Sequence, residues 1–171
     1  TVLRVIGQQR GVSANTIFDE EYSDAQYIVP GVNYVYSFRI VPVAAGYDAD
    51  YISDRQLRTL YTKRGELISK GDSHYQALLI PASHKMPTET LEYLLRLAKK
   101  GATILFLDCY PDDVPGFGRL EERDEFRELA QTLPREATFD TTQVFAIGRG
   151  RVVTGNNFDE MVQAAGIRPE P

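Results

Sequence analysis

The sequence has almost no cysteine and no tryptophan, and what it lacks excludes several kinds of protein. Cys109 is the single cysteine, so no internal disulfide can form, and no Cys/His cluster has zinc-site spacing. No apolar run reaches the roughly 18 residues that a membrane span needs. The net charge is −5 with both signs interspersed, so neither nucleic acid nor a membrane is expected as a partner. No glycine-rich dinucleotide motif or phosphate loop is present, so no cofactor is expected.

What is present fits one folded domain. The chain has 171 residues, 43% of them hydrophobic and 25% charged, which is typical of a globular protein. That length can bury one sizeable core. Residues 1–171 are therefore predicted to form a single domain. Because the chain already opens in a strand-like segment, we expect it to be excised from a longer protein.

The second half of the chain has the clearer pattern. Residues 77–80 and 103–107 are uninterrupted apolar runs, which are typical of strands buried on both faces. Between them, residues 87–100 have an apolar stripe at helical spacing, with Pro87 in the first turn and Gly101 just past the end. This unit predicts two adjacent parallel strands in the sheet interior, joined by a right-handed crossover helix.

Three further elements follow. The apolar positions from Phe126 to Leu133 predict a helix that ends before Pro134. Residues 144–147 and 151–153 flank a Gly-Arg-Gly turn, which indicates a hairpin. Asn157 is a natural N-cap for a last helix that ends at Gly166.

The first half of the chain is less regular. Strands are expected at residues 3–6 and 49–52, an extended segment at 34–43, and a short hairpin arm at 65–68. Alternating strands and helices predict an α/β layer fold with a mainly parallel sheet and a C-terminal β-hairpin.

Several short motifs in order resemble a known family. They are Gly46-Tyr-Asp-Ala-Asp-Tyr-Ile-Ser53, Gly65-Glu-Leu, Tyr75-Gln-Ala-Leu-Leu-Ile-Pro81, Met86-Pro-Thr-Glu-Thr-Leu91, Gly101-Ala-Thr, Gly148-Arg-Gly-Arg-Val152 and Gly166-Ile-Arg-Pro-Glu170. Over residues 46–170 this order is similar to the glutamine-amidotransferase-like module of the large α-L-rhamnosidases of glycoside hydrolase family 106. The extended segment at 34–43 has no place in that pattern.

The resemblance implies a three-layer fold of the flavodoxin-like or class I glutamine-amidotransferase-like type. It also implies a periplasmic or extracellular parent enzyme, whose glycosidic chemistry belongs to an inverting carboxylate pair on another domain. The expected partners are then the other domains of that parent and a carbohydrate. Because a fold does not prove a function, the site residues need a separate reading.

Cys109 and His84 are the candidate catalytic residues. Cys109 comes just after a buried strand, near the position of the nucleophile in amidotransferase-like folds. Against that role, bulky Leu107 and Pro111 replace the small residues of a nucleophile turn, and Asp108 opposes thiolate formation. His84 follows the neighbouring strand, where it is either a base brought to Cys109 or an ordinary polar loop residue.

Three acidic residues follow the same strand as Cys109. Asp108 is a candidate binding residue, and Asp112 and Asp113 are candidate metal ligands, because carboxylates at strand ends can bind Mg²⁺ or Ca²⁺. A carboxylate pair could also serve glycoside hydrolysis. The simpler interpretation is a solvated turn, since Pro-Asp-Asp is ordinary turn chemistry.

Aromatic residues alternate in the extended segment. Tyr34, Tyr36 and Phe38 would share one face of a strand. That face could stack on sugar rings, or it could pack in a core or against a neighbouring domain of the parent.

The sequence therefore favours a non-catalytic accessory or scaffold module of a large glycoside hydrolase acting on plant or bacterial polysaccharide. A degenerate cysteine-dependent amidotransferase-like hydrolase and a carbohydrate-binding platform remain the alternatives.

Overall fold

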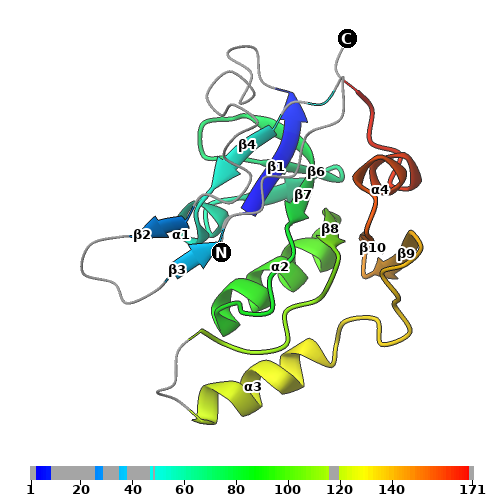
Figure 1. The fold of residues 1–171 in the computed structure, drawn as a ribbon. Helices are drawn as coiled ribbons and strands as arrows, with labels where there is room; N and C mark the ends of the chain where they lie inside the picture. Colours follow the sequence, from blue (N-terminus) through cyan, green and yellow to red (C-terminus); the bar gives the residue numbers. More distant parts are fainter. Residues whose placement is uncertain are drawn as a thin grey trace.

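The structure is a computed structural model that describes residues 3–8, 26–28, 35–37, 47, 49–115 and 120–169. An eight-stranded mixed sheet forms the centre, with the main strand order β4-β1-β7-β8-β10-β9 (Figure 1). Its strands are β1 (Leu3–Gln8), β4 (Ala49–Ile52), β5 (Tyr61–Lys63), β6 (Glu66–Ile68), β7 (His74–Ile80), β8 (Thr103–Leu107), β9 (Gln143–Ile147) and β10 (Gly150–Gly155). The helices are α1 (Asp54–Leu57), α2 (Thr88–Lys100), α3 (Leu120–Ala130) and α4 (Phe158–Ala164). A separate pair, β2 (Gln26–Ile28) and β3 (Val35–Ser37), is antiparallel.

The predicted strand–helix–strand unit is confirmed. β7 and β8 are adjacent and parallel, in register from Leu78 opposite Ile104 to Ile80 opposite Phe106. Both strands lie in the sheet interior, and α2 connects them. Pro87 is the N-cap of α2, one residue before the helix rather than in its first turn, and Gly101, at φ +123°, ends the helix as expected.

The expectation of a mainly parallel sheet is wrong. Among the described strand pairs of this sheet, only β7–β8 and β8–β10 are parallel, whereas β1–β4, β1–β7, β5–β6, β6–β7 and β9–β10 are antiparallel. For β5–β6, β6–β7 and β9–β10 the cause is connection length, because parallel neighbours need a crossover of about a dozen residues while short turns reverse the chain. The turns after β5, β6 and β9 are too short for a crossover. The C-terminal hairpin itself, β9–β10, is confirmed.

Apolar residues on the two faces of the interior strands form separate clusters. Leu78, Ile104 and Phe106 pack with α2 and Phe126 of α3, whereas Leu79, Leu105 and Val153 pack with α4. This division follows from the alternation of side chains along a strand. Helices therefore pack on both faces of the sheet, and in Figure 1 α2 and α3 lie together at the bottom while α4 stands beside the β9–β10 hairpin.

Two helices differ from the sequence prediction: α3 ends earlier than expected, and α1 was not expected. α3 ends at Ala130 rather than at Leu133, which is buried in the turn that follows. α1 was not predicted at all, although its signal is present. Ser53 and Gln56 form a reciprocal capping box, in which Ser53 Oγ accepts from the Gln56 N–H and Gln56 Oε1 accepts from the Ser53 N–H.

No helix in the described part of the chain has the length and apolar character required to cross a membrane.

Candidate functional site

The candidate residues of two loops come together at the carboxyl ends of β7 and β8. Because these strands are parallel and adjacent, the loops that follow them leave the sheet at the same edge. The N–H groups of Asp112 and Asp113 both donate to the His84 carbonyl, at 3.0 and 3.1 Å, and the Met86 N–H donates to the Asp113 carbonyl at 3.0 Å. The loop after β8 is thus fastened along the loop after β7.

His84 and Asp112 form the one described side-chain pair of candidate residues. His84 Nδ1 lies 3.1 Å from Asp112 Oδ2. Both side chains are largely exposed, at 73% and 68% of their full area, so water screens the pair and its contribution to stability is about 0–1 kcal/mol. The pair is therefore accessible to a ligand but weakly held.

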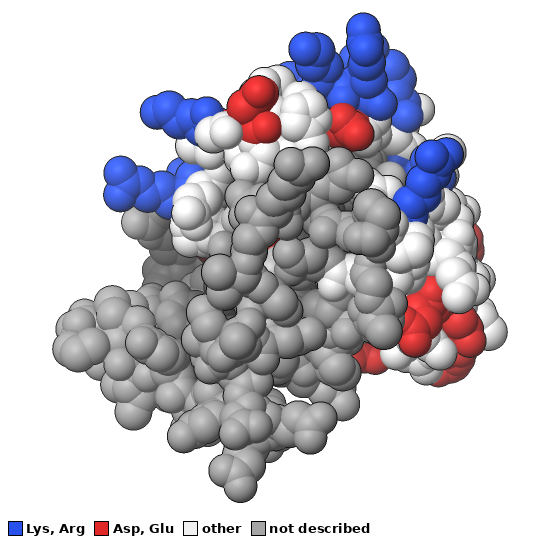
Figure 2. Space-filling view, turned by 90° about the horizontal axis from the view of Figure 1, so that it is seen from above, with Lys and Arg blue, Asp and Glu red and all other residues white. Residues whose placement is uncertain are grey.

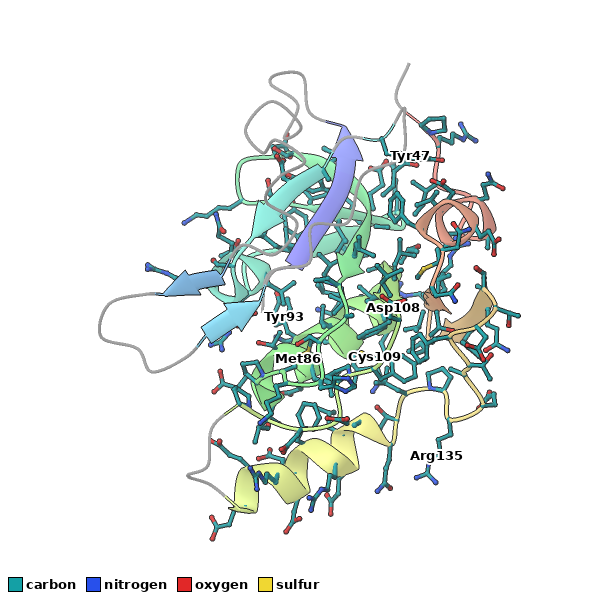
Figure 3. All side chains as sticks on the ribbon, viewed as in Figure 1. Tyr47, Met86, Tyr93, Asp108, Cys109 and Arg135 are labelled. Atoms are coloured by element: carbon teal, nitrogen blue, oxygen red, sulfur yellow. The ribbon has the colours of Figure 1, made fainter. Side chains whose placement is uncertain are left out.

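Cys109 sits in the same loop, directly after a strained residue. Asp108 has φ +66°, a conformation that non-glycine residues rarely adopt, and the Cys109 N–H closes a tight turn on the Leu107 carbonyl at 2.9 Å. A tight turn therefore forms despite Leu107 and Pro111. The left-handed position belongs to Asp108 and not to the cysteine. Figure 3 shows Asp108 and Cys109 just past the end of β8.

The electrostatics around the thiol disfavour a nucleophile. Burial raises the pKa of Cys109, and the charges of Asp108 and Asp112 raise it further, while a hydrogen bond from the Ser83 backbone opposes them. Within the described residues, no hydrogen bond joins the His84 ring to the sulfur. The fold thus brings His84 to the cysteine loop, as the parallel strands allow, but the ring turns to Asp112.

Asp113, the other candidate metal ligand, contacts a backbone N–H group and an arginine. Asp113 Oδ1 accepts from the Val114 N–H at 2.9 Å and lies 3.3 Å from Arg123 Nε. In the described ranges there is no group of three or more His, Cys, Asp or Glu residues arranged to hold a metal ion. Asp113 therefore serves the loop, and Asp112 is the acidic side chain that remains accessible.

The aromatic candidates lie outside what the structure describes. Tyr34 and Phe38 are not among the described residues, and of Tyr36 only the backbone, in β3, is described. The stacking face that they were expected to form stays a prediction.

The sequence analysis did not single out Tyr110. Its ring makes edge-to-face contacts with Phe106 and Phe139, at centroid distances of 5.0 and 5.1 Å. Its hydroxyl is buried without a hydrogen-bond partner, and burial raises the pKa of Tyr110. Sequence position offers one signal, since Tyr110 follows Cys109. The ring contacts of Tyr110 with Phe106 and Phe139 join the loop after β8 to the core.

Fold and site together define an α/β domain with a polar loop cluster at the ends of its parallel strands. Residues 27–171 match the family model of glycoside hydrolase family 106, alpha-L-rhamnosidase. The chain belongs to that family. The match begins at residue 27, earlier than the resemblance from residue 46 indicated.

A solved structure shows the same fold. The rhamnosidase from Novosphingobium sp. PP1Y is similar, with a TM-score of 0.54 and 22% sequence identity. The similar region covers 75% of this chain and 12% of that chain. The similar region thus spans only about one eighth of the length of that rhamnosidase. No curated protein matches the sequence.

Proposed function

We propose that this chain is a non-catalytic accessory or scaffold module of a large α-L-rhamnosidase-like enzyme that acts on plant or bacterial polysaccharide. The observation that carries the proposal is the extent of the family match. It includes residues 27–171 of this chain, while the similar region is only 12% of the length of a rhamnosidase. Most of such an enzyme, including room for a catalytic domain, lies elsewhere.

The loop site supports the same proposal. Hydrolysis of a glycosidic bond needs an acid and a base placed on either side of the sugar. Here Asp112 is exposed and paired with His84, and Asp113 is bound to Arg123 and its own loop backbone. Neither carboxylate has the arrangement of a catalytic pair. The flavodoxin-like or glutamine-amidotransferase-like form of the fold, and its place as one domain of a longer parent, are parts of this proposal.

The test is an assay of the 171-residue chain on an aryl α-L-rhamnoside, with the rhamnosidase from Novosphingobium sp. PP1Y as the positive control. We expect no turnover above the uncatalysed rate. Turnover that disappears in Asp112→Asn but persists in Asp140→Asn, an exposed acidic residue of another loop, would refute the proposal.

One observation favours a second candidate, a degenerate cysteine-dependent hydrolase. His84, Asp112 and Cys109 lie on two adjoining loops, and they are the residue types of a nucleophile, a base and an orienting acid. Its requirement is a reactive thiolate. Alkylation of Cys109 that accelerates below pH 8 and is lost in His84→Ala would favour this candidate over the accessory module.

A further inference from the structure

Six cationic side chains gather at the end of the sheet opposite the loop site. They come from the β5–β6 turn, the end of α2 and the β9–β10 turn, and all are exposed. We call them the basic surface: Lys63, Arg64, Arg96, Lys99, Lys100 and Arg149.

Backbone contacts hold these three segments together. A Cβ built on Gly101 would lie 3.8 Å from the Gly65 Cα, so the β5–β6 turn abuts the end of α2. On the other side, the Arg149 N–H donates to the Lys99 carbonyl at 3.1 Å. The backbone contacts of these three segments thus bring the six residues to one end of the sheet.

No described ion pair neutralises a charge of the basic surface. None of the six takes part in an ion pair among the described residues, although the chain as a whole carries a net charge of −5. Glu66 stands opposite Lys63 across the hairpin, but its carboxylate contacts His74 at 2.9 Å. The α2 dipole offers about half a negative charge at its end, which is too little to balance six cations. Figure 2 shows Lys and Arg side chains along the upper margin of that view, with acidic side chains among them.

Arg64, in the β5–β6 turn, has a backbone conformation that does not favour an arginine. Arg64 and Gly65 are the two central residues, with φ of +53° and +87°. Turns with positive φ at both positions favour Asn, Asp or Gly, because a longer side chain is strained there. Arg64 therefore carries a conformational cost, which a role in binding would explain.

An aromatic side chain adjoins these cations. Tyr61 lies two residues before Lys63 on the same face of β5 and is 48% exposed. The Arg96 guanidinium stacks 4.3 Å from the Tyr93 ring centroid, and the Tyr93 hydroxyl donates to the Leu60 carbonyl at 2.8 Å. These contacts join the Arg96 side chain, through Tyr93, to the backbone of Leu60, the residue before Tyr61.

We propose that the basic surface with Tyr61 binds an anionic polysaccharide. Cations suit the carboxylate or sulfate groups of such a chain, and an exposed tyrosine ring suits the apolar face of a sugar. An acidic protein would use the cations but would not need Tyr61. The choice of a glycan as the ligand rests on the proposed role in a carbohydrate-processing enzyme. The positive charge and the exposure of Tyr61 are observed independently of that role.

The experiment measures binding of the 171-residue chain to polygalacturonate, with neutral dextran and polyglutamate as comparison polymers. We expect polygalacturonate to bind at low salt and to dissociate at 1 M NaCl, where the Debye length is about 3 Å. Lys63→Gln/Lys100→Gln should weaken binding about fivefold, given a contribution of up to about 1 kcal/mol for exposed charge pairs. The matched control Arg127→Gln/Arg135→Gln removes the same charge elsewhere and should have little effect. Lys63→Arg/Lys100→Arg should retain binding.

Tyr61→Ala separates the glycan from an acidic protein. It should weaken polygalacturonate binding while Val144→Ala, at the other exposed large apolar residue described, leaves it unchanged. Equal binding of polyglutamate with no effect of Tyr61→Ala would overturn the proposal in favour of an acidic polypeptide. Absence of polygalacturonate binding would overturn it as well. Either result is independent of the rhamnoside assay, so failure here and failure of the accessory role can be told apart.

Discussion

Gln76 in β7 holds the backbone of Arg168 with both ends of its amide. Gln76 Nε2 donates to the Arg168 carbonyl at 2.9 Å, and the Arg168 N–H donates to Gln76 Oε1 at 2.9 Å. The two residues are 92 positions apart, so this one side chain ties the segment after α4 to the centre of the sheet. Ile167, the residue before Arg168, is buried in the apolar cluster between the sheet and α4.

Loss of this clamp should loosen the C-terminal segment. Gln76→Ala removes two hydrogen bonds and should lower the free energy of unfolding by about 1–3 kcal/mol. Amide hydrogen exchange should show faster exchange at Ile167 and Arg168 than in the wild type. Gln163→Ala, at an exposed position of α4, is the control. Unchanged exchange at Arg168 in Gln76→Ala would contradict the prediction.

Gly150 is predicted to tolerate no side chain. A Cβ there would lie 2.2 Å from the Ala102 carbonyl oxygen and 2.3 Å from that of Ala98, both backbone atoms. Gly150→Ala should therefore cost more than about 2 kcal/mol of unfolding free energy, because the hairpin must move away from α2. Gly71→Ala is the matched control, since its Cβ would meet only Ser69 Oγ at 3.8 Å. Chemical denaturation of the two variants measures the difference, and equal stabilities would refute the predicted clash.

The strain at Asp108 can be measured by comparing glycine with alanine. Both substitutions remove the side-chain interactions of Asp108, but only alanine keeps the cost of φ +66°. Asp108→Gly should therefore be more stable than Asp108→Ala by about 1 kcal/mol. At Asp112, which has no positive φ, the order should be reversed because glycine gains more entropy on unfolding. The same order at both positions would show that Asp108 is unstrained.

The Cys109 thiol should titrate above the ordinary value of about 8.5. Burial is the main cause of the raised pKa, so Asp108→Asn should lower the pKa by removing a nearby negative charge but should not bring it below 8.5. Iodoacetamide labelling rates measured against pH give this pKa. Asp72→Asn is the control for a distant charge, because exposed Asp72 lies before β7, at the opposite end of that strand from the Cys109 loop. A pKa well below 8.5 that rises in His84→Ala would establish a histidine-activated cysteine instead.

The hydroxyl of Tyr110 should contribute nothing to folding stability, whereas its ring should contribute strongly. The buried oxygen has no partner, while the ring packs between Phe106 and Phe139. Tyr110→Phe should leave the stability unchanged or raise it by up to about 1 kcal/mol, whereas Tyr110→Ala should lower it by about 3–5 kcal/mol. Thermal unfolding distinguishes the two. A marked loss of stability in Tyr110→Phe would mean that the hydroxyl has a bound partner.

The sequence by itself determined the elements whose signals are local. α2 begins after Pro87 and ends at Gly101, and α4 begins after Asn157, whose Oδ1 accepts from the N–H groups of Asp159 and Glu160. Uninterrupted apolar runs indicated β7 and β8, and the amphipathic helix between them predicted their parallel pairing. The family resemblance also came from sequence, through motifs in a fixed order.

Only the tertiary structure decided how distant segments combine. The mixed order of the sheet depends on where β1 and β4 pair, and no local pattern encodes the partner of a strand. The orientation of the His84 ring toward Asp112 and away from Cys109 depends on how two loops pack, which spacing cannot specify. The basic surface joins turns that are more than 80 residues apart, from Arg64 to Arg149, and its charges look interspersed along the chain because their clustering exists only after folding.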